Sequence, residues 1–337
     1  MKIDEQISFK ETKLDVVTMG ELLVDMISSD YVPTLKEAIH FHKVFGGSPG
    51  NIAVNLARMN HLTALISCVG RDDFGDFLLE FLTDYGVGQE GIQVTDKATS
   101  MVFVTKSLEN PSFLPVRHAD LELRTEECQF RLIDQTKIFH FTAWALSHLE
   151  IRQTTMELLC HAKAQKKLIT FDPNYRKVLW EKGHDGPGFI LQHVLPMVDI
   201  IKPSESDAEN LFGTTNRREF VRLLKQNSHC FVILTLGAEG LLAIDGEEVH
   251  HVPSHARRVV DTTGAGDAFW AGFMGAVLKG RSLRRALQLG SYSSAYKLGT
   301  VGAVCQLLEE EQLEAWVTEN GKGVSHEDRV SQSPGKF

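Results

Sequence analysis

The chain contains 337 residues, a length that suits one large α/β domain or two medium-sized ones. Its 43% hydrophobic and 23% charged residues are ordinary for a globular protein in water. The net charge of −9 and the lack of a basic run argue against a nucleic-acid or anionic-membrane partner. Residues 1–14 are polar, and no apolar stretch approaches the ~18 residues of a membrane span, so we expect a cytoplasmic protein.

Short apolar segments recur along the chain and predict buried parallel strands. They lie at Val16–Met19, Ala64–Val69, Lys137–Phe141, Lys167–Phe171, Val198–Ile201 and Cys230–Leu236. Helices are predicted between and after them, at Asn51–Met59, Asp73–Tyr85, Arg152–Ala164, Arg218–Gln226, Ala265–Leu278, Leu283–Lys297 and Glu309–Glu319. This alternation is typical of an α/β fold in which helices cover both faces of a mostly parallel sheet.

Two segments, residues 22–42 and 98–123, interrupt this alternation because they look strand-like rather than helical. We interpret them as insertions that pair in space to form a small second sheet, a lid over the edge of the main sheet. Two ordinary surface hairpins are the alternative that the sequence leaves open. Residues 1–337 would then form a single domain, with a Ser/Gly/Lys-rich tail at 321–337 that we expect to be flexible.

The five cysteines are widely spaced and form no CxxC pair. This pattern indicates reduced thiols in a cytosolic protein and gives no ligand spacing for zinc.

The strongest local signal is the sequence DTTGAGDAF at residues 261–269, which precedes an apolar helix. Gly264 and Gly266 allow the backbone to approach a ligand closely. A helix beginning near Ala265 would direct its free N–H groups at an anion, for which phosphate is the natural occupant. Asp267 in the first turn is either a favourable helix-start acid or a general base beside the anion site. A dinucleotide fingerprint is disfavoured because Phe269 stands where Gly or Ala is needed, and the chain has no Walker P-loop.

A second glycine-rich motif, FGGSPGN, spans residues 45–51 and precedes a helix. Gly47 would let the backbone approach a polar ligand, and Asn51 offers both a donor and an acceptor to vicinal hydroxyls. A turn that only caps the helix, with Pro49 in its first turn, is the alternative.

Together the two motifs resemble those of the ribokinase-like (PfkB) carbohydrate kinases, in matching order from about Val16 to Trp316. The resemblance implies a ribokinase-like α/β fold, in which helices flank a central mostly parallel sheet and a small β lid closes over the sugar. It also implies ATP as phosphoryl donor, with Asp267 as the catalytic base beside Gly264, Ala265 and Gly266.

Further roles follow from the same resemblance. Asp25, Gly47 and Asn51 resemble residues that contact sugar hydroxyls. Thr235, Gly237 and Gly240 resemble the loop on the nucleotide side. A plain β-turn after a strand is the alternative for these residues. Asp261 and Thr263 resemble positions that coordinate a monovalent cation such as K⁺ in some relatives, together with carbonyls near Gly302.

The chain departs from the family at residues 204–207, where SESD replaces the common Asn-x-x-Glu. Mg²⁺ is implied by ATP chemistry because it neutralises phosphate oxygens. The departure leaves Glu205 and Asp207 as alternative residues on the Mg²⁺ path.

Arg117 and Arg176 are the residues that bear on which sugar is used. They resemble positions in fructokinases and in ketodeoxygluconate kinases, and could meet a neutral ketose or the carboxylate of an acidic sugar. Fructose is the expected substrate, with acidic sugars, other sugars and nucleosides as alternatives. A catalytically silent sugar-binding regulator and a nicotinamide dehydrogenase are the rival functions, and the exposed lid strands suggest a homodimer formed through the lid.

Overall fold

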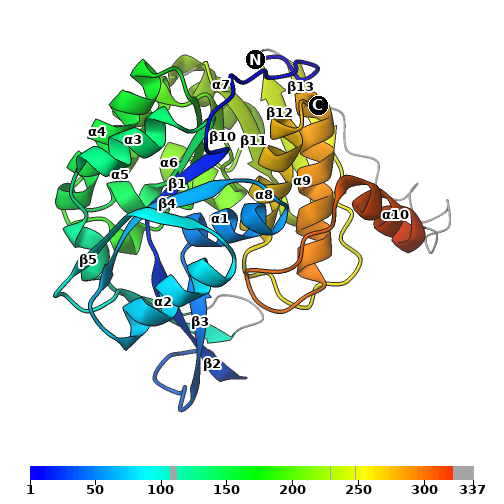
Figure 1. Cartoon of the computed structure of the whole chain (residues 1–337). Coiled ribbons are helices and arrows are strands. Elements are labelled where there is room, and N and C mark those ends of the chain that lie inside the picture. The colour runs from blue at the N-terminus through cyan, green and yellow to red at the C-terminus, as the bar shows by residue number, and fades with distance from the viewer. Residues whose placement is uncertain (107–111, 228, 247, 322–337) are drawn as a thin grey trace.

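The computed structural model describes residues 1–106, 112–227, 229–246 and 248–321, so the predicted tail lies outside the described residues apart from its first position. Strands alternate with helices along the chain and assemble into one large and one small sheet (Figure 1). Within the described residues, no helix combines the length and apolar character needed to cross a membrane. The cytoplasmic location stays a prediction.

The large sheet has nine strands in the order β13-β12-β11-β10-β9-β8-β1-β4-β5. The strands span Val16–Met19 (β1), Thr63–Gly70 (β4), Gly88–Thr95 (β5), Ile138–Thr142 (β8), Leu168–Asp172 (β9), Ile200–Ile201 (β10), Phe231–Thr235 (β11), Leu241–Asp245 (β12) and Glu248–Val252 (β13). Neighbours from β5 to β11 pair in parallel, whereas β12 and β13 add an antiparallel edge. The predicted mostly parallel sheet is therefore confirmed.

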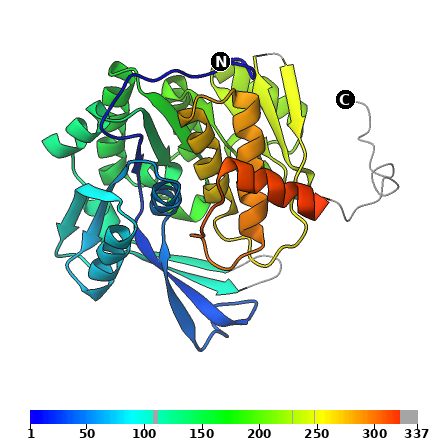
Figure 2. The same ribbon diagram turned by 45° about the vertical axis from the view of Figure 1, so that its right-hand side comes forward.

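Helices cover both faces of this sheet (Figure 2). Their bounds are Ser48–Arg58 (α1), Asp73–Asp84 (α2), Glu127–Asp134 (α3), Leu149–Ala164 (α4), Gly186–Phe189 (α5), Glu205–Phe212 (α6), Arg217–Asn227 (α7), Ala265–Leu278 (α8), Leu283–Leu298 (α9) and Glu310–Gly321 (α10). Helices α1, α8 and α9 share one hydrophobic core, and α3, α4, α6 and α7 share another on the opposite face.

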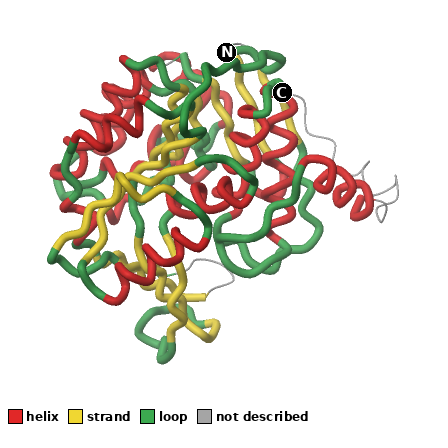
Figure 3. Tube along the Cα trace, in the orientation of Figure 1, coloured by secondary structure: helices red, strands yellow, loops and turns green. Residues whose placement is uncertain are grey.

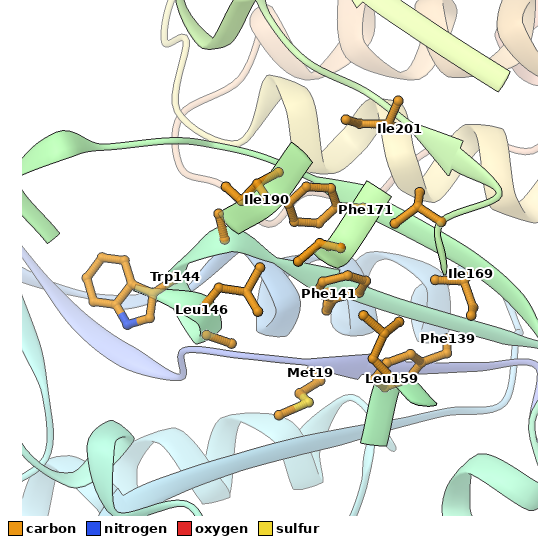
Figure 4. Close-up of a cluster of buried hydrophobic side chains, with 14 of the residues drawn as sticks. Met19, Phe139, Phe141, Trp144, Leu146, Leu159, Ile169, Phe171, Ile190 and Ile201 are labelled. Atoms are coloured by element: carbon orange, nitrogen blue, oxygen red, sulfur yellow. The ribbon is translucent and has the colours of Figure 1, made fainter. Parts of the chain in front are cut away.

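The core beneath α4 shows why the central strands read as continuous apolar runs. Phe139, Phe141 and Phe171 lie fully buried on adjacent strands and meet Leu159 of α4 (Figure 4). The rings of Phe141 and Phe171 stack with their centroids 4.7 Å apart. Strands buried on both faces cannot alternate polar and apolar residues, since either orientation faces a helix layer.

The small sheet has four strands in the order β3-β2-β6-β7. They span Leu23–Tyr31 (β2), Phe41–Gly46 (β3), Met101–Lys106 (β6) and Phe113–Val116 (β7). The two central strands, β2 and β6, pair in parallel, although β3 and then the main-domain elements α1, β4, α2 and β5 lie between them in sequence. The predicted second sheet is confirmed, and the alternative of two independent hairpins is wrong because strands from both insertions share hydrogen bonds.

Strand register places the ends of several strands side by side. Met19 lies opposite Phe141, and Phe141 lies opposite Phe171, which in turn pairs with Ile201. The residues that follow these positions therefore meet along the carboxyl edge of the sheet. Figure 3 shows that this edge carries loops and lies next to the small sheet, as expected for a ligand site in an α/β protein.

Candidate active site

Helix α8 begins at a glycine that no other residue can replace without strain. Gly264 adopts a left-handed conformation with a φ of 74°, and a Cβ there would lie 2.6 Å from Ala303 Cα. The turn leads directly into Ala265, Gly266 and Asp267, whose backbone N–H groups lie in the first turn of the helix. This turn lacks intrahelical acceptors and forms the positive end of the helix dipole, so it suits an anion.

The carboxylate of Asp267 receives hydrogen bonds from the start of α1. Ser48 Oγ donates to Oδ1 at 2.6 Å, and Asn51 Nδ2 donates to Oδ2 at 2.9 Å. Burial raises the pKa of Asp267, while these two donors act in the opposite direction by stabilising the charged form. The two glycine-rich motifs thus meet at one carboxylate.

A second buried carboxylate, Glu21, fixes the start of α1. Its Oε1 accepts from Ser48 N at 3.2 Å and its Oε2 accepts from Thr142 Oγ1 at 2.9 Å. Gly47 has a φ of 102°, and a Cβ there would lie 2.3 Å from the Glu21 carbonyl oxygen. Burial raises the pKa of Glu21 to about 8, and the charge of Asp267 adds to this effect. The sequence reading missed Glu21 as a site residue.

Asp25 projects from β2 of the small sheet towards the same place. Its carboxylate lies against Gly46, where an added Cβ would be 2.4 Å from Oδ2. Burial and the charge of Asp267 raise the pKa of Asp25 to about 7. Four predicted residues, Asp25, Gly47, Asn51 and Asp267, are therefore brought together, and the hydroxyls of a small polyol suit the carboxylates between the two sheets.

A buried lysine that the sequence reading also missed, Lys202, lies close enough to Asp267 to interact with its charge. Lys202 Nζ forms an ion pair of 2.8 Å with Asp172, whose Oδ2 also accepts from Trp270 Nε1 at 2.8 Å. A Cβ placed on Gly266 would be 3.4 Å from Lys202 Nζ. The ammonium therefore lies beside the first turn of α8, where it adds positive charge to the anion site. A charged residue at the end of the apolar run Val198–Ile201 was the available signal.

The two carboxylates predicted for the Mg²⁺ path have different surroundings. Asp207 caps α6: its Oδ2 accepts from Ser204 N at 2.8 Å and its Oδ1 from Tyr175 N at 2.6 Å. Burial raises its pKa, as does the nearby charge of Asp172. Glu205, by contrast, forms a partly exposed ion pair of 2.8 Å with Arg217.

The loop predicted for the nucleotide adjoins Ser204, the residue that precedes α6. Thr235 ends β11 and forms an isolated bridge with Ser204. Gly237 has a φ of 55°, and an added Cβ there would meet nothing within 4 Å, so this part of the loop borders open space. Gly240, with a φ of 99°, passes so close to the end of β13 that a Cβ would lie 2.1 Å from Val252 O.

The two predicted arginines differ in how free they are. Arg117 is half-buried, and its Nε and Nη2 both donate to Oδ2 of Asp120, which also accepts from Trp144 Nε1 at 2.7 Å. Arg176 is exposed, and its guanidinium lies 4.9 Å from the ring centroid of Phe113 in β7. Only Arg176 combines exposure with a contact to the lid.

The predicted cation residues form a closed turn before α8. Asp261 Oδ1 accepts from Thr263 N at 2.9 Å, and Oδ2 accepts from Gly302 N at 2.8 Å. Burial opposes ionisation of Asp261, but these backbone donors keep its pKa below the usual value. The side chain thereby joins the two loops on either side of Gly264.

Known proteins resemble the chain over nearly its whole length. The profile of the pfkB family carbohydrate kinases matches residues 13–309. An ATP-dependent 6-phosphofructokinase of Thermoanaerobacterium thermosaccharolyticum is 42% identical over 304 residues, or 90% of this chain and 94% of the relative.

Solved structures give the same picture. The fructokinase of Halothermothrix orenii is 40% identical, with a TM-score of 0.75 over 82% of this chain and 98% of its own. A Vibrio cholerae fructokinase bound to fructose, ADP and calcium is 25% identical, with a TM-score of 0.78 over 90% and 99% of the two chains. On this evidence the chain belongs to the pfkB family of carbohydrate kinases.

Proposed function

We propose that this carbohydrate kinase transfers the γ-phosphoryl group of ATP to a hydroxyl of fructose. The observation that carries the proposal is the position of Asp267, a buried carboxylate in the first turn of α8 that is close enough for its charge to raise the pKa of the lid carboxylate Asp25. A base, an anion site and a polyol site are thereby adjacent. The names of the relatives support ATP and fructose as the two substrates.

In the proposed reaction, Asp25 and Asn51 hold hydroxyl groups of the sugar. Asp267 takes the proton from the attacking sugar hydroxyl. The oxygen of that hydroxyl bonds to the γ-phosphorus, and the bond between the γ-phosphorus and the oxygen that leaves with ADP breaks. Burial raises the pKa of Asp267, which makes it a better proton acceptor. The N–H groups of Gly266 and Asp267 and the ammonium of Lys202 stabilise negative charge on the transferred group.

The loop from Thr235 to Gly240 would accommodate the nucleotide, since Gly237 borders open space. The donor set nearby fits Mg²⁺, which prefers carboxylate oxygens and retained water molecules. Glu205 would bind the ion only by leaving its ion pair with Arg217, whereas Asp207, whose oxygens already accept N–H groups, would use its remaining lone pairs. When bound, Mg²⁺ would neutralise the phosphate oxygens of ATP. The small sheet would close over the sugar and exclude water, which otherwise competes as acceptor.

Fructose 6-phosphate is a second candidate because the 42% identical relative is named a 6-phosphofructokinase. Arg176 is the residue that would distinguish the two sugars. Its exposed guanidinium beside Phe113 of the lid can meet a phosphate, or the carboxylate of an acidic sugar.

The test is a screen of fructose, fructose 6-phosphate, ribose and ketodeoxygluconate with Mg²⁺-ATP, with ADP and the phosphorylated product both measured. We expect fructose to give the highest kcat/KM, and Arg176→Met to change that value little. A preference for fructose 6-phosphate that Arg176→Met removes would assign the second candidate. The absence of ADP formation with every sugar would support the silent regulator.

A homodimer formed through the lid is also proposed. Both edges of the small sheet, β3 and β7, are short, and β7 contains Pro115, which has no N–H to donate to a second copy. Pairing would therefore use β3. Light scattering of the protein and of a Phe41→Pro variant tests this, because a dimer that survives the substitution would exclude the β3 edge.

A further inference from the structure

Lys297, in the last turn of α9, places its ammonium group inside the protein. The side chain has 0% exposure, and Nζ donates to Asp261 O at 2.9 Å and to Thr300 O at 3.4 Å. The carboxylate oxygen Oδ2 of Asp261 lies 3.8 Å away. A buried lysine is rare, and here oxygen atoms from two different loops surround it.

The position is one that attracts a cation for reasons of backbone structure. The two carbonyl oxygens that accept from Nζ, Asp261 O and Thr300 O, belong to loops and lie just beyond the carboxyl end of α9, the negative end of that helix dipole. An ammonium group has three donors and no acceptor, so carbonyl oxygens satisfy it. Carbonyl oxygens are also ligands of K⁺. The same oxygens can hold a potassium ion or the ammonium of Lys297, but not both.

The oxygens around Lys297 belong to the loops that shape the anion site. The segment before α8 meets the end of α9: Val260 N donates to Leu298 O at 2.7 Å, and loops fill this region beside α8 (Figure 3). Besides the hydrogen bond from Gly302 N to Asp261, Ala303 packs directly on Gly264. A cation between Asp261 O and Thr300 O therefore fixes the turn from which the first N–H groups of α8 project.

We propose that the ammonium of Lys297 takes the place of a bound monovalent cation, so that the kinase activity does not depend on K⁺. This differs from the K⁺ site that the sequence predicts at Asp261 and Thr263. A K⁺ ion and the ammonium of Lys297 would repel each other in this space. The repulsion would be strong, because at a separation of about 4 Å in a buried site there is little solvent screening. Burial lowers the pKa of Lys297, and the charge of Asp261 opposes this effect. The inference rests on the proposed kinase function for its activity readout but not for its binding readout.

The first test measures the full-length protein with Mg²⁺-ATP and fructose in about 0.1 M KCl, NaCl or tetramethylammonium chloride, a concentration that fixes the ionic strength. ADP is quantified directly, because coupling enzymes can themselves respond to K⁺. We expect kcat to agree within about twofold among the three salts, since a loss of anion-site order would cost far more. Activation by K⁺ of more than about fivefold would overturn the proposal.

The second test compares Lys297→Ala with Lys297→Met. The alanine variant opens the space between the carbonyls, whereas methionine keeps it filled without a charge. In tetramethylammonium chloride we expect both variants to lose at least about tenfold in kcat. K⁺ should restore the alanine variant only. A purely structural role would not give this difference, because both variants remove the same hydrogen bonds.

Thermal unfolding supplies a readout that does not need activity. K⁺ should raise the Tm of Lys297→Ala and leave the wild type and Lys297→Met unchanged. If Lys297→Ala responds to K⁺ neither in rate nor in Tm, the proposal is wrong. If neither variant folds, the wild-type comparison decides alone. If the wild type phosphorylates no sugar but the Tm pattern is as expected, the proposed function fails while this inference stands.

Discussion

Ser48 and Asp267 are 219 positions apart in sequence, yet Ser48 Oγ donates a hydrogen bond of 2.6 Å to Asp267 Oδ1. Ser48 is the first residue of α1, and Asp267 lies in the first turn of α8. The loop proposed to contact the sugar and the proposed base therefore form one hydrogen-bonded unit. A substitution in the sugar loop is therefore expected to change the position and pKa of the base, and a substitution of the base to change the position of the loop.

Asp267→Asn removes the proposed base while keeping its shape. We expect kcat to fall roughly 10²–10⁴-fold, with little change in the KM for ATP. Asp76→Asn, an exposed acid in the first turn of α2, is the matched control and should retain full activity. A near wild-type kcat for Asp267→Asn would exclude the assigned base.

Ser48→Ala removes one donor to the base. Because the hydrogen bond stabilises the carboxylate, its loss should raise the pKa of Asp267 and move the acidic limb of the kcat–pH profile to higher pH. We expect about a tenfold loss of kcat near neutral pH, as for a hydrogen bond to a charged group. Ser48→Thr keeps a hydroxyl and should restore the profile. An unshifted profile in the alanine variant would show that Ser48 does not tune the base.

Asp25 should make sugar binding depend on pH. Its pKa is raised to about 7. The ionised carboxylate accepts hydrogen bonds from sugar hydroxyls at both oxygens, whereas in the protonated form one oxygen carries a donor instead. The KM for the sugar should therefore fall by up to about tenfold between pH 6 and pH 8, as the ionised fraction rises. In Asp25→Asn the KM should be high and independent of pH. An equal pH dependence in that variant would assign the effect to another group.

Ionisation of Glu21 should lower the stability of the folded protein as pH rises. Its folded pKa is raised to about 8, above the unfolded value near 4.5, so the folded state binds more protons between these values. The free energy of unfolding should fall as pH rises from about 5 to 8. Glu21→Gln keeps an acceptor for Ser48 N and removes the charge, so urea unfolding of this variant should vary less with pH. A slope identical to that of the wild type would contradict the assignment.

Lys202 can be tested for two separate roles. Lys202→Met leaves the carboxylate of Asp172 buried and uncompensated, which should cost about 3–5 kcal/mol of stability. Adding Asp172→Asn should restore much of that stability. Phosphoryl transfer should stay low in the double variant, because the positive charge beside Gly266 is still absent. Recovery of both properties together would assign Lys202 a structural role only.

Most of the fold could be predicted because its signals are local. The apolar run of β1 and the helix Ala265–Leu278 match the structure residue for residue. The strand β5 was missed because its sequence, GQEGIQVT, is largely polar and lies only partly buried. The edge strands β12 and β13 form an antiparallel pair outside the βα alternation. Only two residues of the predicted strand Val198–Ile201 pair as β10.

From the residues alone, the site could be predicted only where glycine marks a turn, whereas Asp25 within β2 was expected only from the family resemblance. Gly47 and Gly264 each lie in a glycine-rich motif that precedes a helix, and both have a positive φ. Glu21 and Lys202 act through contacts between distant segments, which no local pattern displays. Ser204 and Asp207 were interpreted only as part of a metal path, although Ser-x-x-Asp also fits a helix capping box, which they form in α6.

The meeting of the first turns of α1 and α8 has a consequence for how the site is charged. Each helix start carries roughly half a positive elementary charge, so the peptide backbone alone contributes about one unit. This charge does not titrate, and replacing a side chain cannot remove it. Even a variant that lacks both Lys202 and Asp267 should therefore still attract the triphosphate. New sugar specificities can then evolve in the lid without changes to the phosphate site.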